Sequence, residues 1–154
     1  MARMEISGTC YTAQEDVKEF FYRLGIGPEL ARYFGLPPVR VGLLVDALGS
    51  EAPSELLGME PGSTFSPCLS VLPMGFSYAF CVAQQVHLHI ASVVLGSDGL
   101  LVDRAPPPRI EAQHDTAHMI YADNASQFGL DLDIVTHRRE LLSQALNGRG
   151  LDTH

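Results

Sequence analysis

The chain has 154 residues, with 10 Lys+Arg against 18 Asp+Glu and a formal net charge of −8. This length suffices for one domain with its own core, and a hydrophobic content of 46% excludes compositional disorder. Phosphate contacts dominate nucleic-acid affinity, so the acidic charge argues against a self-sufficient nucleic-acid binder. The acidic charge is compatible with a fragment of a larger protein or assembly whose basic regions lie elsewhere.

The cysteines and the apolar stretches bear on the compartment. Cys10, Cys68 and Cys81 show no C-x-x-C spacing, so we expect buried free thiols in a reducing compartment. No signal peptide is evident at the N-terminus. The most apolar stretch, residues 76–95, is interrupted by Ser, Gln and His and does not predict a membrane span. We therefore expect an intracellular protein, in cytoplasm or nucleus, that is neither secreted nor membrane-bound.

In the first half of the chain, residues 1–15 are too short for a separate domain, and Gly and Pro separate the later elements. The predicted elements are a strand-like run ending at Asp16, a short helix opened by Pro28 with residues 29–34 as its body and Gly35 as its stop, a strand over residues 39–48, a surface loop over residues 49–64, and a strand over residues 68–72.

In the second half, apolar residues recur at intervals of three and four over residues 77–94, which predicts a helix. Residues 96–115 contain three consecutive prolines and predict a long connection. A strand, a tight turn around Asp123 and a second strand come next, and a final helix is predicted over residues 133–146, ended by Gly148 or Gly150. This mixture predicts an α+β fold rather than a doubly wound sheet.

Two acids carry the most informative chemistry. Asp123 lies at the tip of the predicted turn, within Tyr-Ala-Asp-Asn at residues 121–124, and Asp16 ends another strand. Two ionised carboxylates that converge on one face of a sheet need a compensating cation, and two divalent ions ~3.5–4 Å apart clamp a phosphoryl displacement. Alternatively, each Asp is an ordinary turn residue, since Asp favours turns.

Four segments resemble the catalytic motifs of reverse transcriptases. Residues 16–22, Asp-Val-Lys-Glu-Phe-Phe-Tyr, resemble the first motif, and residues 72–77, Leu-Pro-Met-Gly-Phe-Ser, resemble the second, usually Leu-Pro-Gln-Gly-Phe. Residues 121–124 resemble the third, usually Tyr-x-Asp-Asp, and the last helix closing with Gly150-Leu151 is similar to the fourth. The motifs occur in the family's order over roughly residues 10–154.

The resemblance implies a single domain over residues 1–154, a fragment of a retrotransposon-type RNA-directed DNA polymerase. It would be a polymerase palm, an antiparallel sheet with helices packed on one face, and would transfer nucleotides with Mg²⁺ or Mn²⁺. In the intact parent, the partners would be template-primer nucleic acid and deoxynucleotides. The implied metal ligands are Asp16, the Val17 backbone carbonyl, Asp123 and Asn124.

The resemblance also implies substrate contacts. Phe21 would lie under the incoming sugar and exclude a 2′-hydroxyl, Met74 and Gly75 would lie near the nucleotide or template, and Tyr121 would brace the hairpin near the primer end. Three of these positions have a purely structural alternative, namely core packing for Phe21, a turn glycine for Gly75 and a packed strand aromatic for Tyr121.

The chain departs from the family pattern. Met74 replaces a Gln, and Asn124 replaces an acid and brings no charge, which weakens metal binding. The sequence shows no fingers or thumb, so we expect this chain alone to polymerise weakly or not at all. The alternative is a non-catalytic retroelement relic or a repurposed interaction module; the oligomeric state is open.

Two histidine pairs are further candidates. His114 and His118 are four residues apart with Asp115 between them, which is the spacing of a helical metal pair. Because the stretch leads into a strand, we expect solvent-facing loop histidines instead. His87 and His89 are expected on different faces of a helix, which disfavours a shared ligand.

Overall fold

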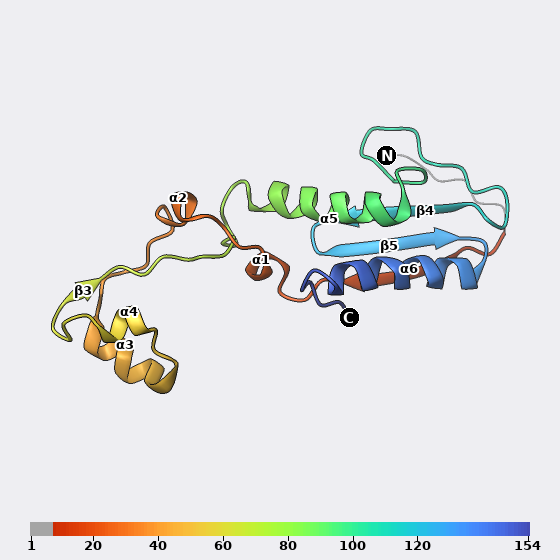
Figure 1. Cartoon of the computed structure of the whole chain (residues 1–154). Helices are drawn as coiled ribbons and strands as arrows, with labels where there is room; N and C mark the ends of the chain where they lie inside the picture. The colour runs from red at the N-terminus through yellow and green to blue at the C-terminus, as the bar shows by residue number, and fades with distance from the viewer. Residues whose placement is uncertain (1–7) are drawn as a thin grey trace. The chain divides into compact units, whose positions relative to one another are not determined.

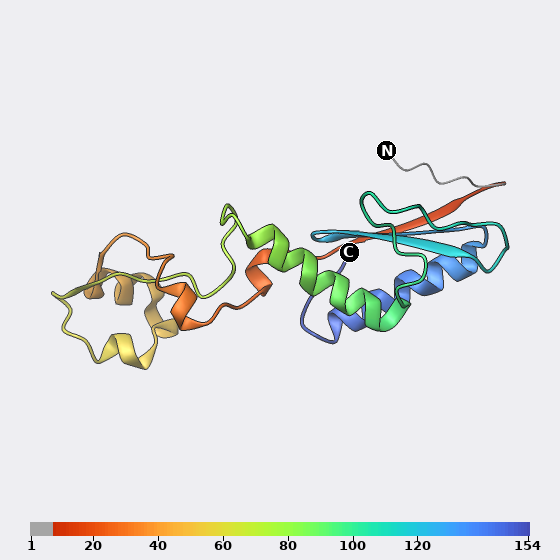
Figure 2. The ribbon, with the colours of Figure 1, turned by 90° about the horizontal axis from the view of Figure 1, so that it is seen from above.

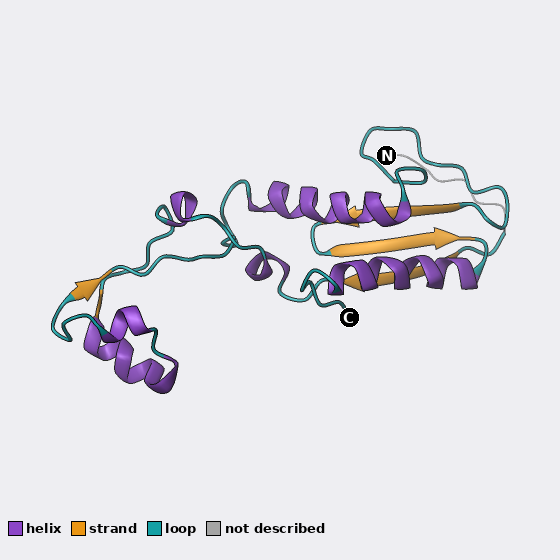
Figure 3. Ribbon diagram, in the orientation of Figure 1, coloured by secondary structure: helices purple, strands orange, loops and turns teal. Residues whose placement is uncertain are grey.

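The structure is a computed structural model that describes residues 8–154. The described chain divides into two compact units. The first unit comprises residues 8–24 and 74–154, and the second comprises Gly25–Pro73. The described chain contains both helices and antiparallel strands, which confirms the predicted α+β class (Figures 1 and 3).

A three-stranded antiparallel sheet organises the first unit. The strands are β1 (Tyr11–Asp16), β4 (Thr116–Tyr121) and β5 (Asn124–Gly129), in the order β1-β5-β4. Two long helices, α5 (Ala79–Leu95) and α6 (Leu132–Asn147), pack against each other and against one face of this sheet (Figure 2). The strand–turn–strand around Asp123 and both long helices are where the sequence predicts them.

Local chemistry explains where α6 begins and which face it buries. The Asp131 carboxylate accepts the backbone N–H of Asp133 at 2.9 Å and of Ile134 at 3.2 Å, which caps the first turn. On the buried face, Val135, Leu142 and Leu146 are fully buried. Burying one such side chain stabilises the fold by roughly 1.5–3 kcal/mol, so packing on the sheet holds this helix in place.

One hydrophobic cluster forms the core of the first unit. It joins β1, the short helix α1 (Phe20–Arg23), α5, α6 and the hairpin. Its buried members are Val17, Phe20, Ala83, Ile90, Ala91, Leu95, Ile120, Ala125, Leu142, Leu146 and Leu151. These residues lie far apart in the sequence, so the core ties the end of β1 to the hairpin.

Both edges of the sheet receive further backbone pairing. On the β1 side, Asp16 and His154 exchange backbone hydrogen bonds of 3.2 and 3.1 Å, which places residues 152–154 antiparallel to the end of β1. On the β4 side, Gly99 accepts from the N–H of His118 at 2.8 Å. Gly99 has φ +83°, and a side chain there would overlap the Thr116 carbonyl oxygen. The end of β1 that carries Asp16 is therefore held from both sides.

The second unit contains short elements around a two-stranded antiparallel sheet, with Val41 and Leu56 buried. Its elements are α2 (Pro28–Ala31), β2 (Val39–Arg40), α3 (Val41–Leu48), the 3-10 helix η1 (Gly49–Glu51), α4 (Ser54–Leu57) and β3 (Thr64–Phe65).

Several predictions for the second unit are wrong in type or extent. Residues 39–48 are mostly the helix α3, because Val41, Leu44 and Val45 also have the i, i+3, i+4 spacing of a helix face. Residues 68–72 form only isolated bridges, to Gly35 and Gly25. The predicted loop over residues 49–64 contains η1 and α4, and the helix opened by Pro28 is one turn long.

The thiols also differ from the prediction. Cys10, Cys68 and Cys81 are free, as predicted, but all three are exposed rather than buried. Each lies in a position that faces solvent, two of them outside regular helices and strands. Between residues 8 and 154, no helix is both long and apolar enough to cross a membrane.

Candidate functional site

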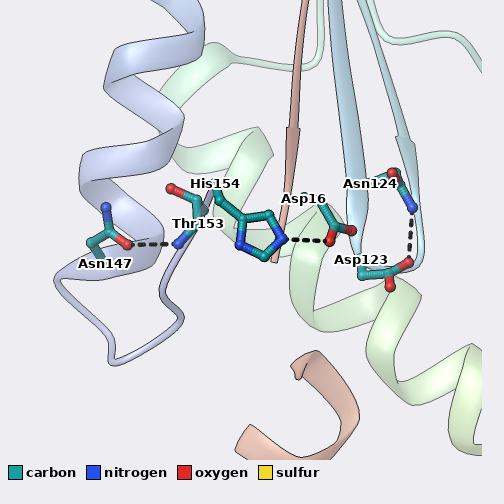
Figure 4. A network of polar contacts seen from close by, with 6 residues as sticks. All are labelled: Asp16, Asp123, Asn124, Asn147, Thr153 and His154. Carbon is teal, nitrogen blue, oxygen red and sulfur yellow. Dashed lines mark hydrogen bonds and ion pairs between the residues drawn. The ribbon is translucent and has the colours of Figure 1, made fainter. Parts of the chain in front are cut away.

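Asp16 and Asp123 come together at one end of the sheet. Asp16 is the last residue of β1 and pairs in register with Asn124, the first residue of β5. The Val17 N–H donates to the Asp123 carbonyl oxygen at 2.9 Å. Figure 4 shows both side chains at this end of the sheet, with the Asp123 carboxylate turned toward Asn124. The structure therefore places the two predicted acids at the same end of one sheet, and their role as a pair stays a prediction.

The alternation of side chains along β1 separates two neighbouring acids. Glu15 is 4% exposed and faces the helices, while the side chain of Asp16 is 41% exposed on the other face. Asn124 is exposed on the same face as its partner Asp16. The pair of acids is thus open to solvent and accessible to a ligand.

Each carboxylate already has a polar partner. The Asp16 Oδ2 lies 3.2 Å from Nε2 of His154, and the Asp123 Oδ1 accepts from Nδ2 of Asn124 at 3.0 Å (Figure 4). The segment that carries His154 is held in turn by a bond from the Thr153 N–H to Oδ1 of Asn147, 3.0 Å long. These donors offset the repulsion that two neighbouring carboxylates otherwise experience.

The donor set is chemically suited to a hard divalent cation. Two carboxylates, a carboxamide oxygen on Asn124 and a backbone carbonyl on Val17 are all oxygen ligands, which Mg²⁺ and Mn²⁺ prefer. Within residues 8–154, no group of three or more His, Cys, Asp or Glu side chains is arranged to hold a metal ion. A divalent ion at this site would have two charged ligands, Asp16 and Asp123. The Asn124 side chain would have to turn its oxygen toward the ion.

The residues assigned by resemblance to the substrate lie around the hairpin and α1. Tyr121 pairs in register with Asn124, is 61% exposed, and its ring centroid lies 5.3 Å from that of Phe80. Phe21 packs against the core, with its ring centroid 6.3 Å from that of Phe20. Both environments also fit the structural alternatives, and the substrate roles stay predictions.

Met74 and Gly75 precede α5. Met74 is 64% exposed, and Gly75 has φ +93° with open space where a side chain would be. This backbone conformation requires glycine, as a turn does and as a close approach to a ligand does. The hydrogen bonds and strand register that join Asp16, Asp123 and Asn124 do not involve these two residues.

Sequence reasoning missed two side chains of α5 that bind the turn. Gln84 and His87 both hydrogen-bond to Ala122, the residue before Asp123. Burial lowers the pKa of His87, although the Ala122 carbonyl and the charge of Asp123 oppose the change. The helical spacing of the two residues shows that they share a face, but nothing in the sequence indicates what that face contacts.

A buried polar row on the helix-facing side of the sheet was also missed. Burial raises the pKa of Glu15 to about 7, while the charge of Arg139 acts in the opposite direction. Both carboxyl oxygens of Glu15 and both polar atoms of the buried Gln127 side chain have no hydrogen-bond partner among residues 8–154. A carboxyl group in this environment is substantially protonated at neutral pH.

The remaining histidines do not form a metal pair. His114 is exposed and lies 3.6 Å from Asp115, as expected for a loop residue. His118 contradicts the prediction of a solvent-facing loop, because it lies in β4 with 1% exposure. Burial and the charge of Arg138 lower its pKa to about 4. His87 is buried and His89 exposed, which confirms that they face different ways.

No family model and no curated protein sequence matches this chain. A function is therefore proposed from the structure itself, namely from the paired acids, the hairpin that carries one of them and the helices behind the sheet.

Proposed function

We propose that the first unit is a reverse-transcriptase-like palm and that Asp16 and Asp123 are its metal-holding acids. One observation carries the proposal. Two acids that are far apart in the sequence lie at the same end of one sheet, joined by the bond from Val17 N–H to Asp123 O of 2.9 Å. Neither acid is buried, so both can reach an ion and a phosphate.

The order of elements supports the same proposal. Apart from the one-turn helix α1, the first unit runs β1, α5, β4, β5, α6 and then a segment that pairs beside β1, which is the order of a βαββαβ arrangement. The segment resembling the first motif begins at the end of β1, that of the second leads toward α5, and that of the third spans the β4–β5 turn. This order of motifs and elements is consistent with the proposed palm.

The chemistry proposed is template-directed transfer of a deoxynucleotide to a primer. Asp16 and Asp123 would hold the divalent ions, with Asn124 and the Val17 carbonyl as neutral donors. Such ions would supply positive charge that favours ionisation of the primer 3′-hydroxyl and offsets charge on the leaving pyrophosphate. Asn124 adds no charge, and a net charge of −8 repels phosphates, so activity of this chain alone is expected to be weak.

Metal titration and primer extension test the proposal together. Mn²⁺ binding is measured for the wild-type chain, Asp16→Asn and Asp123→Asn, with Asp46→Asn, an exposed aspartate of α3, as the matched control. Saturable binding that survives only in the wild type and the control supports the site. Equal binding in all four proteins contradicts it. Efficient primer extension by this chain would contradict the expectation that its polymerase activity is weak.

A non-catalytic interaction module is the second candidate, favoured by a specific observation. Asp16 is paired with His154 and Asp123 with Asn124, so the acids are stabilised without a metal ion. A chain that binds no Mn²⁺ at millimolar concentration supports this candidate over the polymerase palm.

A further inference from the structure

The outer edge of the hairpin is completed by a side chain. The Ala122 N–H donates to Oε1 of Gln84 at 2.7 Å, and Nε2 of Gln84 donates to the Ile120 carbonyl oxygen at 2.8 Å. A neighbouring strand would offer one acceptor and one donor at this edge, and the carboxamide supplies both. Gln84 therefore takes the place of a peptide group in the sheet.

His87 holds the other side of the same residue. Its Nδ1 lies 2.7 Å from the Ala122 carbonyl oxygen, and the imidazole is fully buried, edge-on to the ring of Phe20 at a centroid distance of 5.7 Å. A carbonyl oxygen accepts only, so the proton must be on Nδ1. Gln84 and His87 are one turn apart on α5, and together they engage both the N–H and the C=O of Ala122.

Ala122 needs such support. It has φ +50°, in a two-residue turn between the paired residues Tyr121 and Asn124. Positive φ at this position of a hairpin turn favours glycine, and a residue with a Cβ is strained there. Strained backbone persists only where its surroundings hold it. The Asp123 carboxylate comes directly after Ala122, so its direction depends on how Ala122 is held.

We propose that Gln84 and His87 are positioning residues that keep Ala122 in its left-handed conformation and thereby fix the direction of the Asp123 carboxylate at the end of the sheet that carries Asp16. This inference rests on the proposed metal site. Without the two side chains, the turn relaxes toward negative φ and the two acids separate, while the core behind the sheet remains packed.

The first test replaces Gln84 with methionine, which has similar length and no hydrogen-bonding amide. Two lost hydrogen bonds at the turn are expected to weaken Mn²⁺ binding about tenfold. Gln85→Met is the matched control, because Gln85 is the exposed neighbour on α5, and it is expected to leave Mn²⁺ binding unchanged. Equal Mn²⁺ affinity in Gln84→Met and the control overturns the proposal.

A rescue variant separates positioning from general destabilisation. Glycine accepts positive φ without strain, so Ala122→Gly should make the turn independent of its supports. Adding Gln84→Met to Ala122→Gly is expected to weaken binding by about threefold or less, compared with about tenfold in the Ala122 background. An equal loss in both backgrounds means that Gln84 acts through the fold alone. His87→Asn, which keeps a donor near Nδ1, should bind Mn²⁺ better than His87→Leu.

A metal-free measurement keeps this test distinct from that of the proposed function. The three-bond amide–α-proton coupling of Ala122, measured by NMR, reports its φ angle directly. Gln84→Met is expected to shift this coupling, and Ala122→Gly/Gln84→Met to retain the wild-type position of the Asp123 amide signal. If the wild type binds no Mn²⁺ but the coupling shifts, the metal site fails and the positioning stands. An unshifted coupling overturns the positioning, whatever the metal result.

Discussion

Replacing Glu15 with glutamine should stabilise the protein at neutral and alkaline pH. Glu15 is 4% exposed, and neither carboxyl oxygen has a hydrogen-bond partner among the described residues. Burial of the carboxylate raises its pKa to about 7 from the ordinary 4.5, although the charge of Arg139 favours the charged form. Glutamine has nearly the same shape and cannot ionise, so it removes the cost of the buried charge.

The sign and size of the effect are set by this pKa. A carboxyl group whose pKa is raised on folding contributes its full stabilisation to the free energy of unfolding below pH 4.5. This stabilisation is lost as the pH rises through about 7. At about 1.4 kcal/mol for each pH unit, the loss amounts to about 3 kcal/mol above pH 7. The difference between Glu15→Gln and wild type should therefore be small at pH 4.5 and grow to about this value at pH 8.

Urea denaturation at intervals between pH 4.5 and 8 measures this difference. His118 acts oppositely, because its pKa is lowered to about 4 and its contribution to stability is lost as the pH falls below 6.5. That contribution is common to both proteins and cancels in the difference. Glu140→Gln, at an exposed position of α6, is the control. A Glu15→Gln difference that is constant with pH would refute the assignment of a buried, neutral carboxyl.

Three further predictions concern other contacts. His154→Ala removes the imidazole that contacts the Asp16 carboxylate, so Mn²⁺ affinity by titration should rise about threefold; an unchanged affinity would show that the pair does not restrict Asp16. Asp131→Ala removes the N-cap of α6 and should lower the free energy of unfolding by about 1 kcal/mol in urea, whereas Asp131→Asn should retain most of it. Gly99→Ala should lower the melting temperature by several degrees because its Cβ meets the Thr116 carbonyl, and no change would contradict that close approach.

Local patterns were sufficient for the long helices and the hairpin of the first unit. The three- and four-residue spacing of apolar residues located α5 and α6, and the tight turn around Asp123 located the hairpin. The same reasoning failed over residues 39–48, where a short apolar run has both strand and helix periodicity. Long elements repeat their pattern over several turns, whereas short ones do not repeat it often enough to distinguish the two.

The sequence likewise identified some residues of the candidate site and missed others. Asp16 and Asp123 were identifiable because acids at strand ends and turns are visible in the sequence. The roles of Gln84, His87 and His154 were not, because glutamine and histidine have no fixed partner in a linear pattern. Their contacts exist only once α5 packs behind the hairpin and residues 152–154 pair beside β1.

Composition, periodicity and the two acids thus determined the α+β class, the long helices, the hairpin and the residues to examine. Only the tertiary structure showed that Asp16 and Asp123 lie at the same end of the sheet and that Glu15 is buried while Asp16 is not. It also showed that side chains of α5 hydrogen-bond to Ala122. The physical reason is that these features depend on strand register and on packing between distant segments. A one-residue change of register would exchange the buried and exposed faces of β1 while leaving every local pattern in the sequence the same.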